Sequence, residues 1–278
     1  MAQLAEAADH RHDVPAVRLA NVDIAFMERG GGRYHAVKGA TLDVAAGEFV
    51  AIVGPTGCGK STLLNVTAGL LKPSAGSVAL SGAPLSGLNR DAGYLFQADA
   101  LMPWKTAVEN VAVGLEVRGV ASKEARARAA EWMGRVGLKA FLDRYPHQLS
   151  GGQRKRVALA QVLILDPKIL LMDEPFGPLD AQTRALMGEL LLRLWSEDRK
   201  AVMFVTHDLE EAIALADRVV IMSAGPGATV IGDHRVELSR PRDPAEIRHD
   251  PGFAAIHKAI WQELKAEVVK AYAQGDKA

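Results

Sequence analysis

The sequence predicts an α/β fold with a parallel sheet at its centre, and two observations carry this prediction. Unbroken apolar runs are typical of strands that a parallel sheet buries on both faces. Such runs occupy residues 49–53, 169–172, 202–205 and 219–222. Segments with helical periodicity lie between them, and this alternation of strands and helices is the pattern of α/β proteins. Residues 61–68, 182–195 and 209–216 are the expected core helices, the second beginning at Asp180 or Gln182.

The amino-terminal part of the chain has a different pattern. Residues 17–25 and 40–44 alternate apolar and polar side chains and are separated by three consecutive glycines at positions 30–32. Alternation with period two is typical of half-buried strands joined by a loop. The sequence therefore predicts an antiparallel β region before the parallel core. The preceding residues 1–14 form a polar tail without the apolar stretch of a secretory signal.

Helical patterning interrupts the core at about residues 98–152, notably over 122–133. We expect an inserted α-helical subdomain there. The arginines of this stretch alternate with glutamates, which is typical of a solvated helix face and not of a nucleic-acid patch. A further helix is expected over residues 154–165. The nucleotide-binding part is expected over residues 15–240, followed by a C-terminal helical tail over 241–278 whose amphipathic helix occupies 253–272.

Composition narrows the possible functions. The chain has 278 residues, of which 49% are hydrophobic and 24% charged, so it has the ordinary composition of a globular protein. Lys plus Arg and Asp plus Glu each number 33, and a net charge of zero argues against an extended nucleic-acid interface. No window approaches the roughly 20 apolar residues that cross a bilayer. The single cysteine, Cys58, cannot form an internal disulfide and fits a reducing compartment.

The most informative motif directly follows the first apolar run of the core. It satisfies the phosphate-binding pattern G-x-x-x-x-G-K-[ST] between a strand and a helix. Glycines let the backbone wrap around phosphates, the lysine can reach the β and γ phosphates, and the serine can ligate Mg²⁺. The loop consists of Gly54, Pro55, Thr56, Gly57, Cys58, Gly59, Lys60, Ser61 and Thr62.

Polar residues also follow two other predicted core strands. Asp173 and Glu174 come after residues 169–172, and His207 follows the run 202–205. Parallel strands present their carboxyl ends at one edge of the sheet, where open α/β sheets bind ligands. Asp173 can hold Mg²⁺, Glu174 can act as a general base toward an attacking water, and His207 can donate a hydrogen bond to a γ-phosphate oxygen.

A second loop with anion-binding features lies farther along the chain. Ser150, Gly151, Gly152 and Gln153 precede the helix expected over residues 154–165, so backbone amides and a hydroxyl are available at its N-terminus. One nucleotide cannot easily contact both loops of the same subunit. The sequence thus contains two loops with phosphate-binding features. An arrangement of the protein is needed in which both loops are used.

Five motifs, in this order, make the chain resemble the ATP-binding subunits of ABC transporters over about residues 17–233. They correspond to the Walker A loop 54–62, the Q-loop with Gln97, the signature 149–153, Walker B ending in Asp173 and Glu174, and the switch histidine His207. The resemblance implies a P-loop ATPase fold. It also implies a head-to-tail homodimer or heterodimer in which two ATP molecules each lie between one subunit's Walker A loop and the other's signature.

The resemblance also implies roles for individual residues. Ser150 and Gly152 would contact the partner's γ-phosphate, Gln97 would contact Mg²⁺ and water, and Asp180 of the D-loop would communicate across the dimer. Phe26 matches the aromatic residue that stacks on adenine, although Tyr34 lies nearby and either ring could stack. Two residues depart from the family pattern, Pro178 in the D-loop and Gln161 after the signature. Neither departure removes a catalytic group.

The amino-acid sequence of residues 103–106 and 173–177 is most similar to that of the nitrate, sulfonate and taurine importers of this family. That resemblance implies an ATPase at the cytoplasmic face of the inner membrane, bound to an integral-membrane permease and served indirectly by an extracytoplasmic solute-binding protein. Residues 101–110 would contact the permease. The alternative is a soluble ABC-type ATPase acting on ribosomes or DNA. The 90 residues from Lys60 to Ser150 contain no sustained heptads, which disfavours the long coiled-coil insertion of such proteins.

Overall fold

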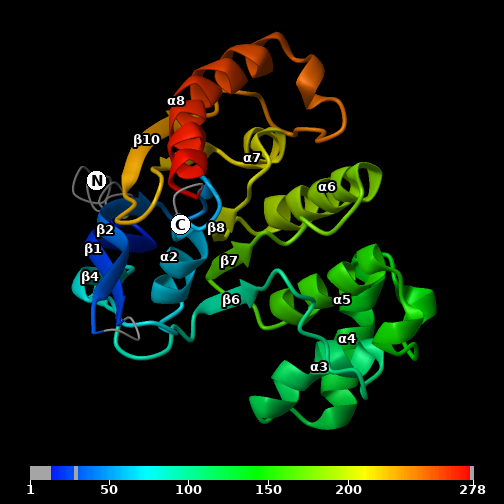
Figure 1. The fold of residues 1–278 in the computed structure, drawn as a ribbon. Coiled ribbons are helices and arrows are strands. Elements are labelled where there is room, and N and C mark those ends of the chain that lie inside the picture. The colour runs from blue at the N-terminus through cyan, green and yellow to red at the C-terminus, as the bar shows by residue number, and fades with distance from the viewer. Residues whose placement is uncertain (1–13, 28–30, 276–278) are drawn as a thin grey trace, which may run out of the picture.

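The computed structural model describes residues 14–27 and 31–275 of the chain and contains a six-stranded and a four-stranded sheet (Figure 1). The tail expected over residues 1–14 lies outside this range except for its last residue. Among the described residues, no helix is long and apolar enough to cross a membrane.

The six-stranded sheet has the order β10-β9-β3-β8-β7-β6. Neighbouring strands in it are parallel except for the β10–β9 pair. The bounds are β3 (Phe49–Val53), β6 (Ala92–Leu95), β7 (Ile169–Asp173), β8 (Ala201–Val205), β9 (Arg218–Met222) and β10 (Val230–Arg235). The four apolar runs are thus confirmed as parallel core strands. Strands β6 and β10 were not predicted, because β6 is short and contains a glycine, and β10 is an edge strand that ends in the polar residues Asp233, His234 and Arg235.

The amino-terminal antiparallel region is confirmed as a four-stranded sheet of order β2-β1-β4-β5. Strand β1 pairs with β2 from Val17 opposite Val44 to Met27 opposite Arg33, so both strands are longer than expected. The later strands β4 and β5 return to this sheet after α2 and were not predicted. The bounds are β1 (Val17–Met27), β2 (Arg33–Val44), β4 (Ala75–Leu80) and β5 (Ala83–Pro84).

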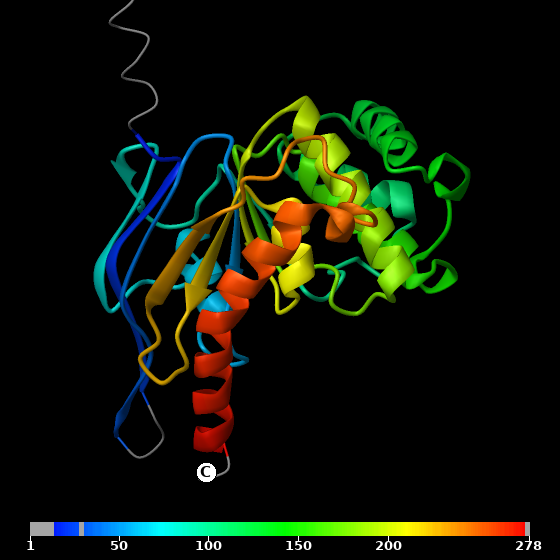
Figure 2. The same ribbon diagram turned by 90° about the horizontal axis from the view of Figure 1, so that it is seen from above.

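The six-stranded sheet is the middle layer of the molecule (Figure 2). On β3, Val50 and Ile52 pack with α2 and with the four-stranded sheet. Ala51 and Val53 point to the other face and pack in a second core with α5, α6 and α7. The helices are α2 (Lys60–Thr67), α3 (Ala107–Val117), α4 (Ser122–Arg135), α5 (Gly151–Leu163), α6 (Ala181–Glu197), α7 (Leu209–Leu215) and α8 (Pro251–Gly275).

Side-chain caps fix where the functional helices begin. Ser150 accepts a hydrogen bond from the Gln153 amide at 3.2 Å, so α5 begins at Gly151 and not at Arg154 as expected. Asp180 accepts a hydrogen bond from the Thr183 amide at 2.9 Å and caps α6. The sequence analysis left the start of α6 open between Asp180 and Gln182, and the cap geometry selects Asp180.

The segment that follows β10 is packed against the core rather than free. Arg242 is buried, and its guanidinium donates to the Ile213 and Ala216 carbonyls at 3.1 and 2.6 Å. These carbonyls belong to the last turn of α7, so Arg242 satisfies a helix C-terminus. Burial lowers the pKa of Arg242 to about 10, with Arg240 adding to the effect. From there α8 runs across the molecule to the C-terminus (Figure 2).

Two glycines that follow helices provide a test of this packing. Gly69 follows α2 with φ of +71° and Gly119 follows α3 with φ of +87°. A Cβ at Gly69 would lie 2.0 Å from the Gly87 carbonyl oxygen, whereas a Cβ at Gly119 would meet nothing within 4 Å. We expect Gly119→Ala to cost about 1 kcal/mol of backbone strain. Gly69→Ala should cost several-fold more, because backbone must also move. Denaturant unfolding of both variants measures the difference, and equal losses would contradict this account.

Candidate nucleotide-binding and catalytic site

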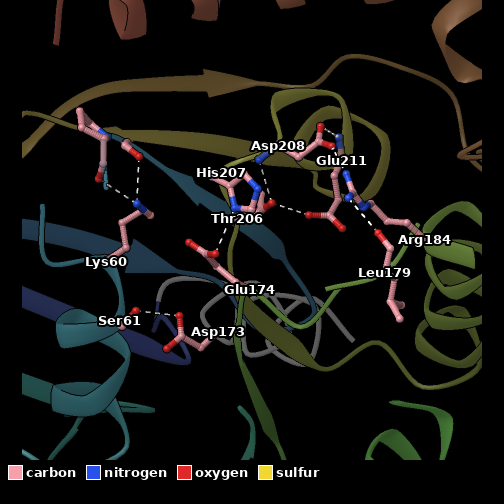
Figure 3. A network of polar contacts seen from close by, with 12 residues as sticks. Lys60, Ser61, Asp173, Glu174, Leu179, Arg184, Thr206, His207, Asp208 and Glu211 are labelled. Atoms are coloured by element: carbon pink, nitrogen blue, oxygen red, sulfur yellow. Dashed lines mark hydrogen bonds and ion pairs between the residues drawn. The ribbon is translucent and has the colours of Figure 1, made fainter. Parts of the chain in front are cut away.

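The predicted site residues meet at one edge of the six-stranded sheet. In this sheet β8 lies between β3 and β7, and β6 lies on the other side of β7. Because these four strands are parallel, the segments that follow them emerge at the same edge. Lys60, His207, Glu174 and Asp173 accordingly lie close to one another in Figure 3.

The phosphate-binding loop is wound so tightly that glycine is required at several of its positions. Gly59 has φ of +95°, and a Cβ there would lie 2.7 Å from Val37 Cγ2. A Cβ at Gly54 would lie 2.9 Å from the Met222 carbonyl oxygen. Lys60 is 6% exposed, and its ammonium donates to the Gly54 and Pro55 carbonyls at 2.9 and 3.0 Å. The loop therefore forms a backbone cradle at the N-terminus of α2, which suits phosphate oxygens.

The side chain of Cys58 points away from the cradle, so only the backbone of this residue is available to a phosphate. Its side chain is buried within the core between the two sheets, and burial raises the pKa of its thiol. A buried thiol with a raised pKa is a poor nucleophile and behaves as a small apolar side chain.

Two of the three residues expected to contact Mg²⁺, Ser61 and Asp173, are in direct contact. Ser61 Oγ donates to Asp173 Oδ1 at 2.8 Å, although the two residues are 112 positions apart. Burial raises the pKa of Asp173. Hard oxygen donors of this kind suit Mg²⁺, which usually retains several water or phosphate ligands. No group of three or more His, Cys, Asp or Glu side chains that could hold a metal occurs in residues 14–27 and 31–275. The donor pair thus fits a magnesium ion. Water and phosphate oxygens would complete its coordination.

Glu174 and His207 form the second contact of the site. His207 Nδ1 lies 3.0 Å from Glu174 Oε2 (Figure 3). The backbone of Glu174 has φ of +41°, a conformation that costs free energy for a residue with a side chain. Its amide donates to the Val205 carbonyl at 2.9 Å, which holds this strained residue beside β8. Strain at this position directs the carboxylate toward the histidine loop.

A polar network behind His207 was missed by the sequence analysis. Arg184 on α6 donates to Asp208 Oδ2 at 2.6 Å, and Asp208 Oδ1 accepts from the Glu211 amide at 3.1 Å. Glu211 in turn accepts a hydrogen bond from the Thr206 hydroxyl. Asp208 with Glu211 three residues later has the form of a helix-capping pair, and this signal could have identified two of these residues. Nothing in the local sequence indicates Arg184.

Gln97 is linked to the helical subdomain through its backbone. The buried Lys155 of α5 donates to the carbonyl oxygens of Gln97 and Phe96 at 2.6 and 3.3 Å and forms an ion pair with Asp99 at 3.1 Å. The Gln97 side chain itself is exposed. The segment after β6 and the helix after Ser150 are therefore tied together by one lysine.

The structure does not bring the second anion-binding loop to the first. Ser150 and Gln153 form a reciprocal capping box at the start of α5, and a Cβ at Gly152 would lie 2.7 Å from Thr183 Cγ2. Helix α5 packs in the core on one face of the six-stranded sheet, and α2 packs in the core on the other. Figure 1 shows the two helices on different sides of β6 and β7. The N-termini of α5 and α2 are therefore separated by the sheet within one chain.

Two further expected residues differ in how closely they approach the site. Asp180 is occupied within its own helix, since its two carboxylate oxygens accept from the Thr183 amide and hydroxyl, which also lowers its pKa. Phe26 pairs with Tyr34 across β1 and β2, and the rings are 43% and 38% exposed. A Cβ at Gly225 would lie 3.6 Å from the Gly57 carbonyl oxygen and 3.9 Å from the Tyr34 hydroxyl, so Tyr34 lies near the phosphate loop.

This fold and site define the ATP-binding subunits of ABC transporters. Residues 37–177 match the ABC transporter family, and the chain belongs to that family. It is an ATPase, and its α/β cassette fold confirms the predicted fold class.

The chain is 44% identical over 245 residues to an ABC transporter ATP-binding protein of Methanocaldococcus jannaschii, covering 88% of this chain and 90% of the relative. It is 43% identical over 226 residues to the taurine import ATP-binding protein of Yersinia pestis, covering 79% and 88% of the two chains. A solved ATP-binding cassette in a dimeric post-hydrolysis state with ADP and phosphate superposes with a TM-score of 0.70 at 34% identity. That match covers 80% of this chain and all of the cassette.

The network behind His207 leads to a pH-dependent prediction. Burial raises the pKa of Glu211 to about 7 from 4.5, so the folded protein binds this proton more tightly than the unfolded chain does. Proton binding by Glu211 therefore adds to the free energy of unfolding, and this contribution is complete below pH 4.5. It is lost as the pH rises toward 7, at about 1.4 kcal/mol per pH unit. Glu211→Gln cannot ionise, so its free energy of unfolding should improve relative to wild type between pH 5 and 8.

Denaturant unfolding at several pH values measures this relative change. The exposed Glu210 on the same helix supplies the control, because Glu210→Gln should parallel wild type. Parallel pH curves for wild type and Glu211→Gln would show that Glu211 ionises normally.

Proposed function

We propose that this chain closes on a second copy of itself or on a homologous ATPase subunit, with two ATP molecules held between them. The observation that carries this proposal is that helices α2 and α5, which begin at the two loops, pack in cores on opposite faces of one sheet. A head-to-tail pair would bring the first loop of each subunit to the second loop of the other. The solved cassette that superposes on this chain is a dimer, which supports the arrangement.

We assign the phosphate groups and the metal to the residues already in contact. The amides of Gly54, Pro55, Thr56, Gly57, Cys58, Gly59, Lys60, Ser61 and Thr62 surround the phosphates, and the Lys60 ammonium moves from the loop carbonyls to the β and γ phosphates. Ser61 and Asp173 would hold Mg²⁺, and Gln97 would contact it through its exposed amide. Magnesium supplies charge neutralisation at the phosphates.

The Glu174–His207 contact suits hydrolysis. Glu174 accepts a proton from the attacking water, and His207 keeps its place through Glu174 while donating to a γ-phosphate oxygen. Phosphoryl transfer depends mainly on positioning and charge stabilisation. The strained backbone of Glu174 and the 3.0 Å contact to His207 supply the positioning in this chain.

The remaining site residues act across the dimer. Ser150, Gly151, Gly152 and Gln153 present the N-terminus of α5 to the partner's γ-phosphate, and Asp180 lies at the same interface. Phe26 stacks on adenine, with Tyr34 as the neighbouring ring.

The ATPase domain extends over residues 15–240, with the helical subdomain at about 98–152 and the C-terminal helical tail over 241–278. Within the helical subdomain Trp104 is 72% exposed on the segment between β6 and α3, which suits a protein interface.

We assign this interface to an integral-membrane permease, which places the chain at the cytoplasmic face of the inner membrane. The 43% identity to a taurine import ATP-binding protein supports an importer for nitrate, sulfonate, taurine or a related small solute, served by an extracytoplasmic binding protein.

Glu174→Gln separates binding from hydrolysis. The amide cannot accept the proton of water, so we expect ATP turnover to fall by about 100-fold or more while ATP binding persists. The variant should therefore accumulate as an ATP-bound dimer, which size-exclusion chromatography with and without ATP and Mg²⁺ detects. Unchanged turnover would overturn the general-base assignment, and a monomer with bound ATP would overturn the dimer.

The same variant tests the membrane partner. Affinity capture from detergent-solubilised native membranes with Glu174→Gln, ATP and Mg²⁺ should recover a polytopic permease, identified by mass spectrometry. Trp104→Ala in the same background is the matched control and should recover less of it. Recovery of ribosomal or DNA-repair proteins without a permease would favour a soluble ABC-type ATPase and overturn the transport proposal.

A further inference from the structure

Arg184 joins two loops that both border the proposed active site. It lies in the first turns of α6, and its side chain is 28% exposed. One end of the guanidinium donates to Asp208 Oδ2 at 2.6 Å, and another nitrogen donates to the Leu179 carbonyl at 3.1 Å (Figure 3). Leu179 immediately precedes Asp180, and Asp208 immediately follows His207. A single planar group thus connects the loop after β7 to the loop after β8.

Asp208 makes further hydrogen bonds besides the one from Arg184, so a change in the position of Arg184 also affects these other contacts. Its second carboxylate oxygen caps α7 through the Glu211 amide at 3.1 Å, and its own amide donates to the Thr206 hydroxyl at 3.0 Å. The residue between Thr206 and Asp208 is His207. Any displacement of Asp208 relative to Thr206 therefore changes the direction of the histidine.

The loop before Arg184 also touches the catalytic pair. A Cβ at Gly177 would lie 3.6 Å from His207 Cε1 and 3.9 Å from Glu174 Oε2. The loop of residues 175–180 consequently lies against both Glu174 and His207, and Arg184 holds its far end at Leu179. The contacts at Gly177 and at Leu179 therefore join the loop of residues 175–180 to the loop that carries His207.

The network retains buried atoms that a purely structural cluster would pair. Among the residues that the structure describes, Arg184 Nε and Glu211 Oε1 are buried without a hydrogen-bond partner. Unsatisfied buried polar atoms cost free energy, and a network with free donors and acceptors can adopt a second arrangement.

We propose that Arg184 is a positioning residue that couples the loop of residues 175–180 to the loop that carries His207, so that contact with the second subunit at Asp180 sets the histidine for hydrolysis. The coupling rests on the proposed function, because it takes this loop to be a contact of the dimer. Arg184 touches neither ATP nor the reacting water. Its effect therefore falls on turnover and not on nucleotide affinity.

Arg184→Lys tests the coupling with little change in charge. Lysine keeps a positive group opposite Asp208 but lacks the planar fork that reaches two acceptors at once. We expect kcat to fall about 10-fold while the dissociation constant for ATP stays within about twofold. Arg193→Lys on the same helix is the matched control, since Arg193 is exposed and donates to the Arg135 carbonyl far from the loops. That control should keep the wild-type kcat.

A double-mutant cycle tests the connection to the histidine loop. Asp208→Asn should lower kcat by a similar factor, and the combination with Arg184→Lys should be no worse than the poorer single variant. A kcat within twofold of wild type for Arg184→Lys overturns the proposal. A multiplicative loss in the double variant or a parallel loss of ATP affinity overturns it as well.

Thermal unfolding separates a damaged fold from loss of coupling. We expect the variants to lose kcat while their unfolding temperature stays within a few degrees of wild type. Dimerisation is measured separately with Glu174→Gln, in which Arg184 is intact. Failure of that variant to dimerise would count against the proposed function, whereas the separation of kcat from ATP affinity decides on Arg184.

Discussion

The parallel alignment of β3, β8 and β7 is the constraint on which the site depends. Three segments that are far apart in the sequence begin where these strands end, and adjacent parallel strands deliver them to one edge of the sheet. The 2.8 Å hydrogen bond between Ser61 and Asp173 follows directly from this alignment. A shift in register between β3 and β8 would separate Ser61 from Asp173, and a shift between β8 and β7 would separate His207 from Glu174.

Part of the backbone strain and some of the unpaired polar atoms of the described residues lie at the same edge. Glu174 has a positive φ, Gly59 closes against Val37, and Arg184 and Glu211 leave buried atoms unpaired. The cores on the two faces of the sheet are apolar and densely filled, and they hold these local costs in place. The apolar cores thus support strained and unpaired groups at the edge of the sheet where the site residues meet.

The sequence analysis predicted the parts of the site that local patterns specify. The loop 54–62 and the residues Asp173, Glu174 and His207 follow apolar runs, and their positions after strands were readable without the structure. Strand β6 was missed because four residues with a glycine carry little signal. Arg184 and Lys155 were missed because each acts through partners more than 20 positions away, at Asp208 and at Gln97.

By itself, the sequence determined which chemistry is possible in this protein: the types of side chain, their order along the chain and the strands after which they stand. Only the tertiary structure decided which of these groups meet. It brought Ser61 to Asp173 and His207 to Glu174, and it kept the loop at 150–153 away from the loop at 54–62 by packing α5 and α2 on opposite faces of one sheet. The physical reason is that motifs record local backbone requirements, whereas contacts between distant residues depend on strand register and on which face of the sheet each helix covers.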